Sequence, residues 1–391
     1  MINKYGFFLI FLFIVQVSGG QTVDECLKSI EANNPRLKAA RKLQEKKTVQ
    51  AHTGIYPKPF SVNYGYFPDN KTVVDQKQTL NATQSFHLPG VYKKMGLLAG
   101  DKEDVASLEF QKIRKDLLSR ARQMMIRMVY LGKRYERLEM RLRYARRQYE
   151  GIRKKAEAAG ATLIDQNKAR LHLLRVQRTI NQNVIERERL REQLMALNGQ
   201  KPLDLRLNEY PAFPDLMQDT LLARKMQQLP SLSIARREMQ VADRQLDLQR
   251  ALNGPELKVG YGAEIVGNSS FRGMVVGASI PLWTNKNKVQ TARLKNEYRQ
   301  LDYESRLMEI RSETRKQYKT SVSLKEDLDA WRSTLDELQS VEVLQKSLKM
   351  DQISLLDYYR EVQYYYGVFD EYLALERDYY LGLDELYRYR L

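Results

Sequence analysis

The amino-acid sequence predicts a mainly α-helical protein with a small β part, in which one arrangement of helices and strands occurs twice. An apolar heptad pattern without proline fills the segment from Leu117 to Ala156, which is typical of a long helix in a coiled coil. Two segments of alternating apolar and polar residues, at about 60–88 and 257–280, are typical of β-hairpins. The same order of features returns about 192 to 197 residues later, which indicates a tandem repeat.

The long helix of the first repeat is the most distinctive element. No proline occurs between Val91 and Gln200, and apolar residues recur at alternating spacings of four and three. This stripe consists of Leu117, Ala121, Met124, Met128, Leu131, Tyr135, Leu138, Leu142, Ala145, Tyr149, Ile152 and Ala156. A helix from Tyr92 to Ala158 would be roughly 100 Å long, so other helices must cover its stripe. Small residues near Gly160 predict a sharp reversal and a returning helix that ends near Asn198.

The first twenty residues are typical of a cleaved secretory signal peptide. Lys4 precedes an apolar run from Phe7 to Val17, and Ser18-Gly19-Gly20 follows it. This run is too short for a membrane-spanning helix, which needs about 20 residues. We therefore expect residues 1–20 to be removed and the mature chain to be exported, with a buried N-terminal helix as the alternative. Export argues against nucleic acid as a partner.

The first repeat, 21–198, is expected to contain a helix, a β-hairpin, the long helix and the returning helix. Apolar residues at helical spacing begin after Thr22, and Pro35 either breaks this first helix or begins a new one. The apolar positions of the hairpin at about 60–88 alternate with small or polar residues. They are Phe60, Val62, Tyr64 and Tyr66 in one strand and Leu80, Ala82, Phe86 and Leu88 in the other. The hairpin therefore has one face of apolar side chains and one face of small or polar side chains, which we call the small polar face.

The second repeat, 218–391, follows a linker at 199–217 that contains three prolines. Leu229-Pro230-Ser231-Leu232 corresponds to Asn34-Pro35-Arg36-Leu37, and a second β-hairpin at about 257–280 corresponds to the first. A second long helix is expected from about Lys288 to Lys349, and a second reversal from Gln352 to Asp357. The distances from Pro89 to Asp165 and from Pro281 to Asp357 are both 76 residues. This agreement in spacing is the strongest support for the repeat.

The strands of the second hairpin indicate a membrane setting. Leu257, Val259, Tyr261, Ala263 and Ile265 alternate with small or charged residues over nine positions. Transmembrane strands need roughly 9 to 11 residues of this kind. Four strands cannot close a barrel, and a bilayer does not tolerate an open sheet edge, because its backbone groups would have no water to bond. The chain must therefore combine its strands with those of further copies, unless both hairpins pack on a soluble core.

Composition argues against several classes of site. A single cysteine, Cys26, excludes an internal disulfide, and the scattered His52, His87 and His172 form no zinc motif. We find no nucleophile with a base, no phosphate-binding loop and no paired acids, so we expect no enzyme and no cofactor. The net charge is +17, and residues 111–155 contain 16 Lys or Arg against 4 Asp or Glu. This basic stretch predicts a solvated face, or contact with an acidic partner or anionic cargo.

The sequence resembles the TolC family of outer-membrane efflux proteins over essentially the whole mature chain. The resemblance rests on the two proline segments, both hairpins and the two reversal motifs, Ala159-Gly160-Ala161-Thr162-Leu163-Ile164-Asp165 and Gln352-Ile353-Ser354-Leu355-Leu356-Asp357. It implies a homotrimer with a 12-stranded β-barrel in the outer membrane, four strands coming from each chain, and a helical tunnel through the periplasm. Gln352 stands where the family often has glycine, and the short region from Gly199 to Pro214 implies a small equatorial domain.

The function that this resemblance implies is that of the outer-membrane duct of a tripartite efflux or secretion system. The duct conducts substrate passively, and its partners are a periplasmic adaptor protein, an inner-membrane pump and outer-membrane lipid. Gly160, Thr162, Asp165 and Ser354 are expected at the periplasmic tip, where the adaptor docks. Asp357 and Arg360 form the candidate gate, with capping of the returning helix as the alternative role for Asp357.

Two other functions compete with the duct. A periplasmic adaptor also carries helical hairpins, but it has one hairpin flanked by soluble β domains, whereas this chain has two hairpins and apolar strands. A basic cytoplasmic coiled coil that binds nucleic acid is opposed by the signal peptide. The sequence therefore favours the duct.

Overall fold

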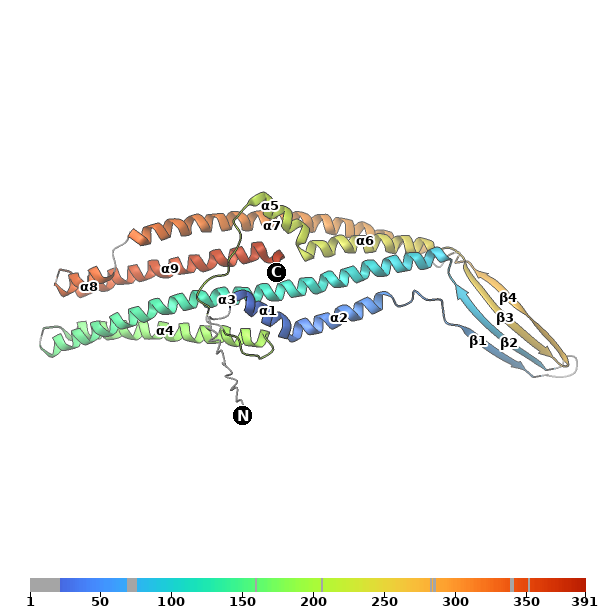
Figure 1. Ribbon diagram of the computed structural model, residues 1–391, viewed down its shortest axis with the longest axis horizontal. Coiled ribbons are helices and arrows are strands. Elements are labelled where there is room, and N and C mark those ends of the chain that lie inside the picture. Colours follow the sequence, from blue (N-terminus) through green and yellow to red (C-terminus); the bar gives the residue numbers. More distant parts are fainter. Residues whose placement is uncertain are drawn as a thin grey trace, which may run out of the picture. The chain divides into compact units, whose positions relative to one another are not determined.

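The computed structural model describes residues 22–68, 76–158, 160–204, 207–281, 283, 286–337, 341–350 and 352–391. Helices alternate with two pairs of strands (Figure 1). In chain order the elements are α1 (Val23–Asn33), α2 (Pro35–Ala51), β1 (Ser61–Phe67), β2 (Lys77–Phe86), α3 (Pro89–Glu157), α4 (Leu163–Leu197), α5 (Gln218–Gln228), α6 (Pro230–Ala251), β3 (Glu256–Val266), β4 (Ser269–Ser279), α7 (Lys286–Glu337), α8 (Val341–Lys349), α9 (Leu355–Tyr387) and the 3₁₀-helix η1 (Arg388–Arg390). The expected signal peptide, 1–20, lies outside the described residues.

The chain forms two compact units, each made from segments that are distant in the sequence. The first unit combines the chain up to Ala32 with Met124–Pro211, and the second combines Asn33–Gln123 with Ala212–Leu391. Helix α3 contributes its C-terminal part to the first unit and its N-terminal part to the second. The division of the sequence at 198 and 217 into two repeats remains a prediction.

A helical hairpin of α3 and α4 dominates the first unit (Figure 1). Of the twelve stripe residues expected along α3, eight are buried and the other four are half-buried. Helix α4 buries Ala169, Val176, Asn183, Leu190 and Leu194, of which the first four follow one another at intervals of seven residues and the last comes four residues later. The heptad pattern therefore continues in the returning helix, as two helices that pack along each other require.

Helix α1 belongs to the same unit and packs against the segment that follows α4. Its start is capped, because the amide of Glu25 donates to the Thr22 hydroxyl and the amide of Thr22 donates to the Glu25 carboxylate. Cys26 is fully buried beside Asp204, and its Sγ lies 3.8 Å from the backbone oxygen of Asp204. Burial, reinforced by the charge of Asp204, raises the pKa of the Cys26 thiol to about 11. This thiol is therefore a packing group with little thiolate character.

Both proline segments begin a helix. The side chain of Asn34 accepts a hydrogen bond from the amide of Leu37 at 3.0 Å, so Asn34 caps α2 and Pro35 is its first residue. Pro230 is likewise the first residue of α6. Proline is favoured there because the first helical amide has no partner within the helix. Of the two alternatives for Pro35, the new helix is correct.

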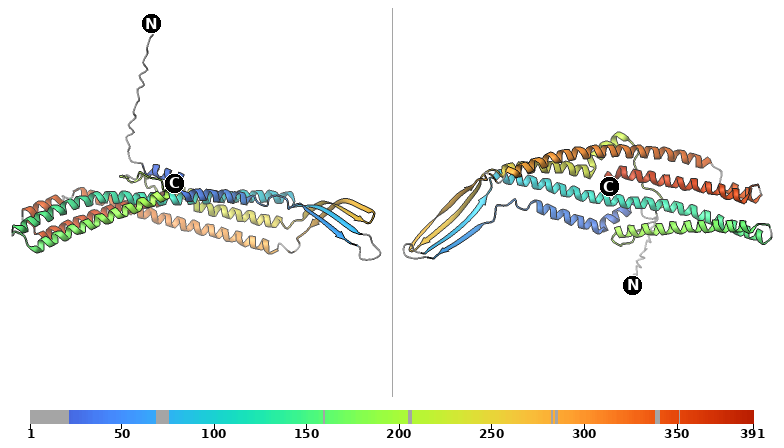
Figure 2. Two further views of the ribbon diagram at one scale, coloured as in Figure 1. Left: turned by 90° about the horizontal axis from the view of Figure 1, so that it is seen from below. Right: turned by 180° about the vertical axis from the view of Figure 1, so that it is seen from behind.

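The four strands form one antiparallel sheet in the order β1-β2-β3-β4, so the two predicted hairpins pair with each other through β2 and β3 (Figure 2). The register aligns Val62, Ala82, Tyr261 and Met274 in one row across the sheet. Because successive side chains point to opposite faces, the alternating apolar residues of all four strands lie on one face. On the other face small residues are required, since a Cβ on Gly260 would lie 2.4 Å from the backbone oxygen of Ala82.

Helices α2, α6, α7 and α9 accompany the N-terminal part of α3 in the second unit. Val91 and Leu98 of α3 pack with Leu248 of α6, and α6 in turn packs along α7. Arg237 of α6 forms ion pairs with Asp101 and Asp104 of α3.

The second long helix, expected from about Lys288 to Lys349, is described as α7 and α8, and residues 338–340 between them lie outside the described residues. Among the described helices, none has the length and hydropathy that crossing a membrane requires.

Candidate functional site: the helix reversals and the four-stranded sheet

The first reversal, between α3 and α4, is a tight turn that is closed by its own polar groups. The amide of Gly160 donates to the backbone oxygen of Lys155 at 2.8 Å. Thr162 caps α4, because its hydroxyl accepts from the amide of Asp165 at 3.2 Å while the Asp165 carboxylate accepts from the amide of Thr162 at 3.3 Å. The hydroxyl also donates to this carboxylate at 2.7 Å and thereby lowers the pKa of Asp165.

The second reversal, between α8 and α9, repeats this chemistry. The hydroxyl of Ser354 accepts from the amide of Asp357 at 3.1 Å and donates to its carboxylate at 2.6 Å. The guanidinium of Arg360 lies 3.0 Å from the other carboxylate oxygen of Asp357. The two candidate gate residues, Asp357 and Arg360, therefore form an ion pair, and Asp357 also occupies the helix-capping position that is the alternative explanation of its role. The gate itself remains a prediction.

Exposed apolar side chains accompany the caps at both reversals. Leu163 and Ile164 follow the first cap and are 71% and 65% exposed, and Leu356 follows the second and is 61% exposed. These residues are part of the reversal motifs, but the motifs alone did not distinguish them from core residues. Their exposure supplies an apolar contact surface at each turn.

The sequence-predicted site residues thus fall into two groups. Thr162 and Asp165 contact each other next to Gly160 in the first unit, and Ser354, Asp357 and Arg360 form one chain of contacts in the second. Docking at the first group and gating at the second stay predictions.

The apolar face of the sheet carries large side chains that are open to the surroundings. They include Val62, Tyr64, Tyr66, Leu80, Leu257, Val259, Tyr261, Ile265, Met274 and Val276, all of which are more than a third exposed. A soluble domain buries such a face against another layer. In the described part of the chain no element covers it, and β1 and β4 each pair with a single neighbour.

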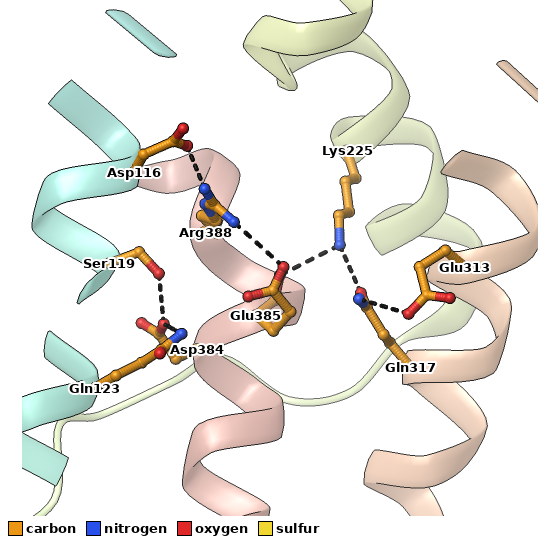
Figure 3. Close-up of polar contacts among 9 residues, drawn as sticks. All are labelled: Asp116, Ser119, Gln123, Lys225, Glu313, Gln317, Asp384, Glu385 and Arg388. Carbon is orange, nitrogen blue, oxygen red and sulfur yellow. Dashed lines mark hydrogen bonds and ion pairs between the residues drawn. The ribbon is translucent and has the colours of Figure 1, made fainter. Parts of the chain in front are cut away.

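A polar network that the sequence did not predict joins α3, α5, α7 and α9 in the second unit (Figure 3). Asp384 is fully buried and accepts from Ser119 at 2.7 Å and from Gln123 at 3.0 Å. Lys225 is also buried, and donates to Gln317 at 2.9 Å. One signal was available: Lys225 lies between Leu221 and Leu229 at spacings of four, on the stripe that an amphipathic helix buries.

The described residues contain no group of three His, Cys, Asp or Glu side chains that could hold a metal ion. The basic side chains Arg143, Arg146 and Arg147 are exposed on α3 in the first unit. The described side chains therefore offer exposed surfaces and capped turns.

No protein-family model matches the sequence, and comparison with curated protein sequences gives no match. Solved structures are similar over nearly the whole chain. The CmeC outer membrane channel of Campylobacter jejuni matches with a TM-score of 0.77 at 14% identity, over 94% of this chain and 85% of that one. CusC, in a study of transmembrane channel formation, matches with a TM-score of 0.76 at 15% identity, over 95% and 92%. The outer membrane protein VceC of Vibrio cholerae matches with a TM-score of 0.77 at 13% identity, over 94% and 95%.

These similarities confirm the predicted fold class, which combines long helical hairpins with four strands per chain. At identities of 13% to 15%, the likeness is one of fold. It extends to both helical hairpins and the sheet, since more than nine-tenths of the chain is covered.

Proposed function

We propose that this chain, which has the fold of the TolC-family outer-membrane channels, is the outer-membrane duct of a tripartite efflux or secretion system. Three copies combine their sheets into one 12-stranded barrel in the outer membrane, and the helical hairpins extend into the periplasm. Substrate moves through the duct passively, and an inner-membrane pump supplies the energy. The chain performs no enzymatic step.

The observation that carries this proposal is the exposed apolar face of the sheet. Apolar side chains such as Val259 and its neighbours are common on a surface that contacts lipid. On a surface that contacts water, their exposure is energetically unfavourable. The outer edges of β1 and β4 need further strands, because unpaired backbone groups are not tolerated in a bilayer. Copies of the same chain provide these strands without any other partner.

The adaptor protein is proposed to dock at the reversals, on Gly160, Thr162 and Asp165 of the first and Ser354 of the second. Capped turns with exposed leucine and isoleucine beside them suit an interface, since apolar contact there adds to a fixed backbone shape. The exposed Arg143, Arg146 and Arg147 add positive charge that would attract an acidic partner surface.

Asp357 is proposed to belong to the gate, held by Arg360 in the closed state. The pair is more than a third exposed and is worth only about 0 to 1 kcal/mol, so one pair cannot keep a channel closed. Three copies around one axis would triple its effect. Opening would then require the three pairs to separate.

Single-channel recording in a planar bilayer tests the duct and its gate together. The purified protein is expected to conduct ions, and Asp357→Asn is expected to raise the open fraction or change cation block. Asp165→Asn, the matched substitution in the other reversal, is the control. A protein that never conducts, although it is folded and inserted, contradicts the duct. A conducting Asp357→Asn channel that behaves like the wild type contradicts the gate alone.

A further inference from the structure

A cavity of about 250 Å³ lies within the second compact unit. Its wall takes residues from the middle of α3, from α5 and the start of α6, from α7 and from the end of α9. This volume corresponds to several water molecules or one small solute, since a water molecule occupies about 30 Å³ in the liquid. The tip and sheet surfaces described above do not include this cavity.

Lys225 is the most buried charged group in the wall, with 5% of its surface exposed. Its ammonium donates to the side-chain oxygen of Gln317 at 2.9 Å and to the backbone oxygen of Glu385 at 3.3 Å (Figure 3). Both acceptors are neutral, and no carboxylate in the described part of the chain forms an ion pair with this ammonium. Burial lowers the pKa of Lys225, which reflects the cost of holding a charge away from water. A third N–H of the ammonium remains for another acceptor.

Two further lysines of α3 line the same cavity. The ammonium of Lys115 donates to the backbone oxygen of Tyr389, again a neutral acceptor, and burial lowers the pKa of Lys115. Lys112 is exposed at the rim. The wall therefore holds three cations for which the described residues supply no ion pair.

The carboxylates of the wall are already engaged with other groups. Asp116 pairs with Arg388, and Glu385 lies 3.5 Å from the same guanidinium. Glu313 accepts from the side-chain amide of Gln317 at 3.1 Å. These contacts hold the carboxylates to the arginine and the amide. The charges of Glu385 and Glu313 act on Lys225 from a distance, without an ion pair to its ammonium.

The N-terminus of α6, which carries a partial positive charge, lines one side of this cavity. Leu229, Pro230 and Ser231 line it, and Leu229 in the N-cap position provides no side-chain acceptor for the first amides of the helix. Pro230 has no N–H, and the amide of Leu232 donates to the backbone oxygen of Leu229 at 3.1 Å, so the amide of Ser231 is the donor that this helix start offers to an anion. The corresponding position of α2 is capped by Asn34, so the two copies differ at this point.

We propose that this cavity is a binding site for a small oxyanion, the chemistry that phosphate and short carboxylic acids share. Lys225 and Lys115 contact the anion directly, and the first turn of α6 holds it from the other side. The bound anion connects α3 to α5 and α6 and stabilises the second unit. This site is independent of conduction and of the adaptor.

Isothermal titration calorimetry on the purified full-length mature protein tests the proposal. Inorganic phosphate and sodium acetate are titrated separately, with sodium chloride holding the ionic strength constant. Saturable binding of either anion, at one site per chain, is expected, and the thermal midpoint should rise with anion concentration. Binding of only one of the two identifies the anion class. Absence of saturable binding for both overturns the proposal.

Three lysine variants make the test specific. Lys225→Gln keeps a hydrogen-bonding group of similar length and should weaken binding at least tenfold. Lys115→Gln, at a less buried position, should also weaken it and covers the case in which Lys225→Gln does not fold. Lys168→Gln, on the exposed surface of α4, is the control and should bind as the wild type does. Equal affinity in the wild type and in folded Lys225→Gln and Lys115→Gln proteins would contradict the assigned site.

Discussion

The carboxylate of Asp384 on α9 accepts a hydrogen bond from the hydroxyl of Ser119 on α3, with 2.7 Å between the two oxygens. Arg122 and Gln123, from the same turn of α3, bind the same carboxylate. Asp384 is fully buried, so these three groups take the place of the water molecules that would otherwise solvate its carboxylate. One charged residue thus ties the last long helix to the first.

Replacing Asp384 should destabilise the protein strongly. Asp384→Ala leaves the mostly buried guanidinium of Arg122 without its counter-ion, and breaking such a pair typically costs about 3 to 5 kcal/mol. Asp378→Ala is the control on the same helix, because its partner Arg377 is much nearer to solvent, and it should cost less than about 1 kcal/mol. Denaturant unfolding, followed by circular dichroism, measures both. Equal effects of the two substitutions would contradict the stabilising role of Asp384.

A bulky residue at Gly160 should abolish export and leave the fold intact. The φ angle of Gly160 is not positive, and an added Cβ would meet only the backbone oxygen of Lys155 at 3.4 Å. The turn therefore tolerates Gly160→Phe, while the surface proposed for the adaptor does not. Gly151→Phe is the control, since a Cβ there also meets open space. Export is measured by complementation of a strain that lacks the chain, and normal export by Gly160→Phe would place docking elsewhere.

The capping contribution of Asp165 should depend on pH. Its pKa is lowered in the folded protein, mainly by the hydrogen bond from the Thr162 hydroxyl. A carboxyl with a lowered pKa stabilises the fold fully above its unfolded pKa, and this contribution is lost as the pH falls through the folded pKa. The thermal midpoint of Asp165→Asn should therefore lie below that of the wild type at pH 7, and the difference should shrink as the pH falls below about 4. A difference that is constant from pH 7 to pH 3 would argue against a role of the charge.

The two faces of the sheet should respond differently to a charge. Val259 and Val275 are on adjacent strands and are 39% and 38% exposed, but they lie on opposite faces. Val259→Lys, on the proposed lipid face, should cost about 2 to 4 kcal/mol per chain at the bilayer midplane and reduce the amount of assembled protein. Val275→Lys, on the small polar face, should assemble nearly normally. Gel electrophoresis of outer-membrane extracts reports this, and the reverse order of effects would exchange the lipid and lumen faces.

Much of the fold could be predicted because its signals are periodic. The stripe from Leu117 to Ala156 fixes which side of α3 is buried, and the alternation through Val62 and Tyr261 fixes which residues share one face of the sheet. The structure agrees with both. The caps at Thr162 and Ser354 are also local, since each bonds a residue three positions later.

The buried polar groups could not be predicted in the same way. Asp384 and Ser119 are 265 residues apart, and Lys225 and Gln317 are 92 apart. Nothing in the sequence around Asp384 or Lys225 indicates which distant residue each one contacts. A charged residue on an apolar stripe, such as Lys225, signals a buried interaction but does not identify the partner. The exposure of Leu163 and Leu356 likewise became evident only from the structure of the turns.

Native mass spectrometry of the protein extracted from the outer membrane tests the central claim most directly. If three copies complete one barrel, the main species has three times the mass of the mature chain, and it persists in a detergent that preserves membrane barrels. Val259→Lys should reduce this species in favour of the monomer. A wild-type protein recovered only as a water-soluble monomer would contradict the account.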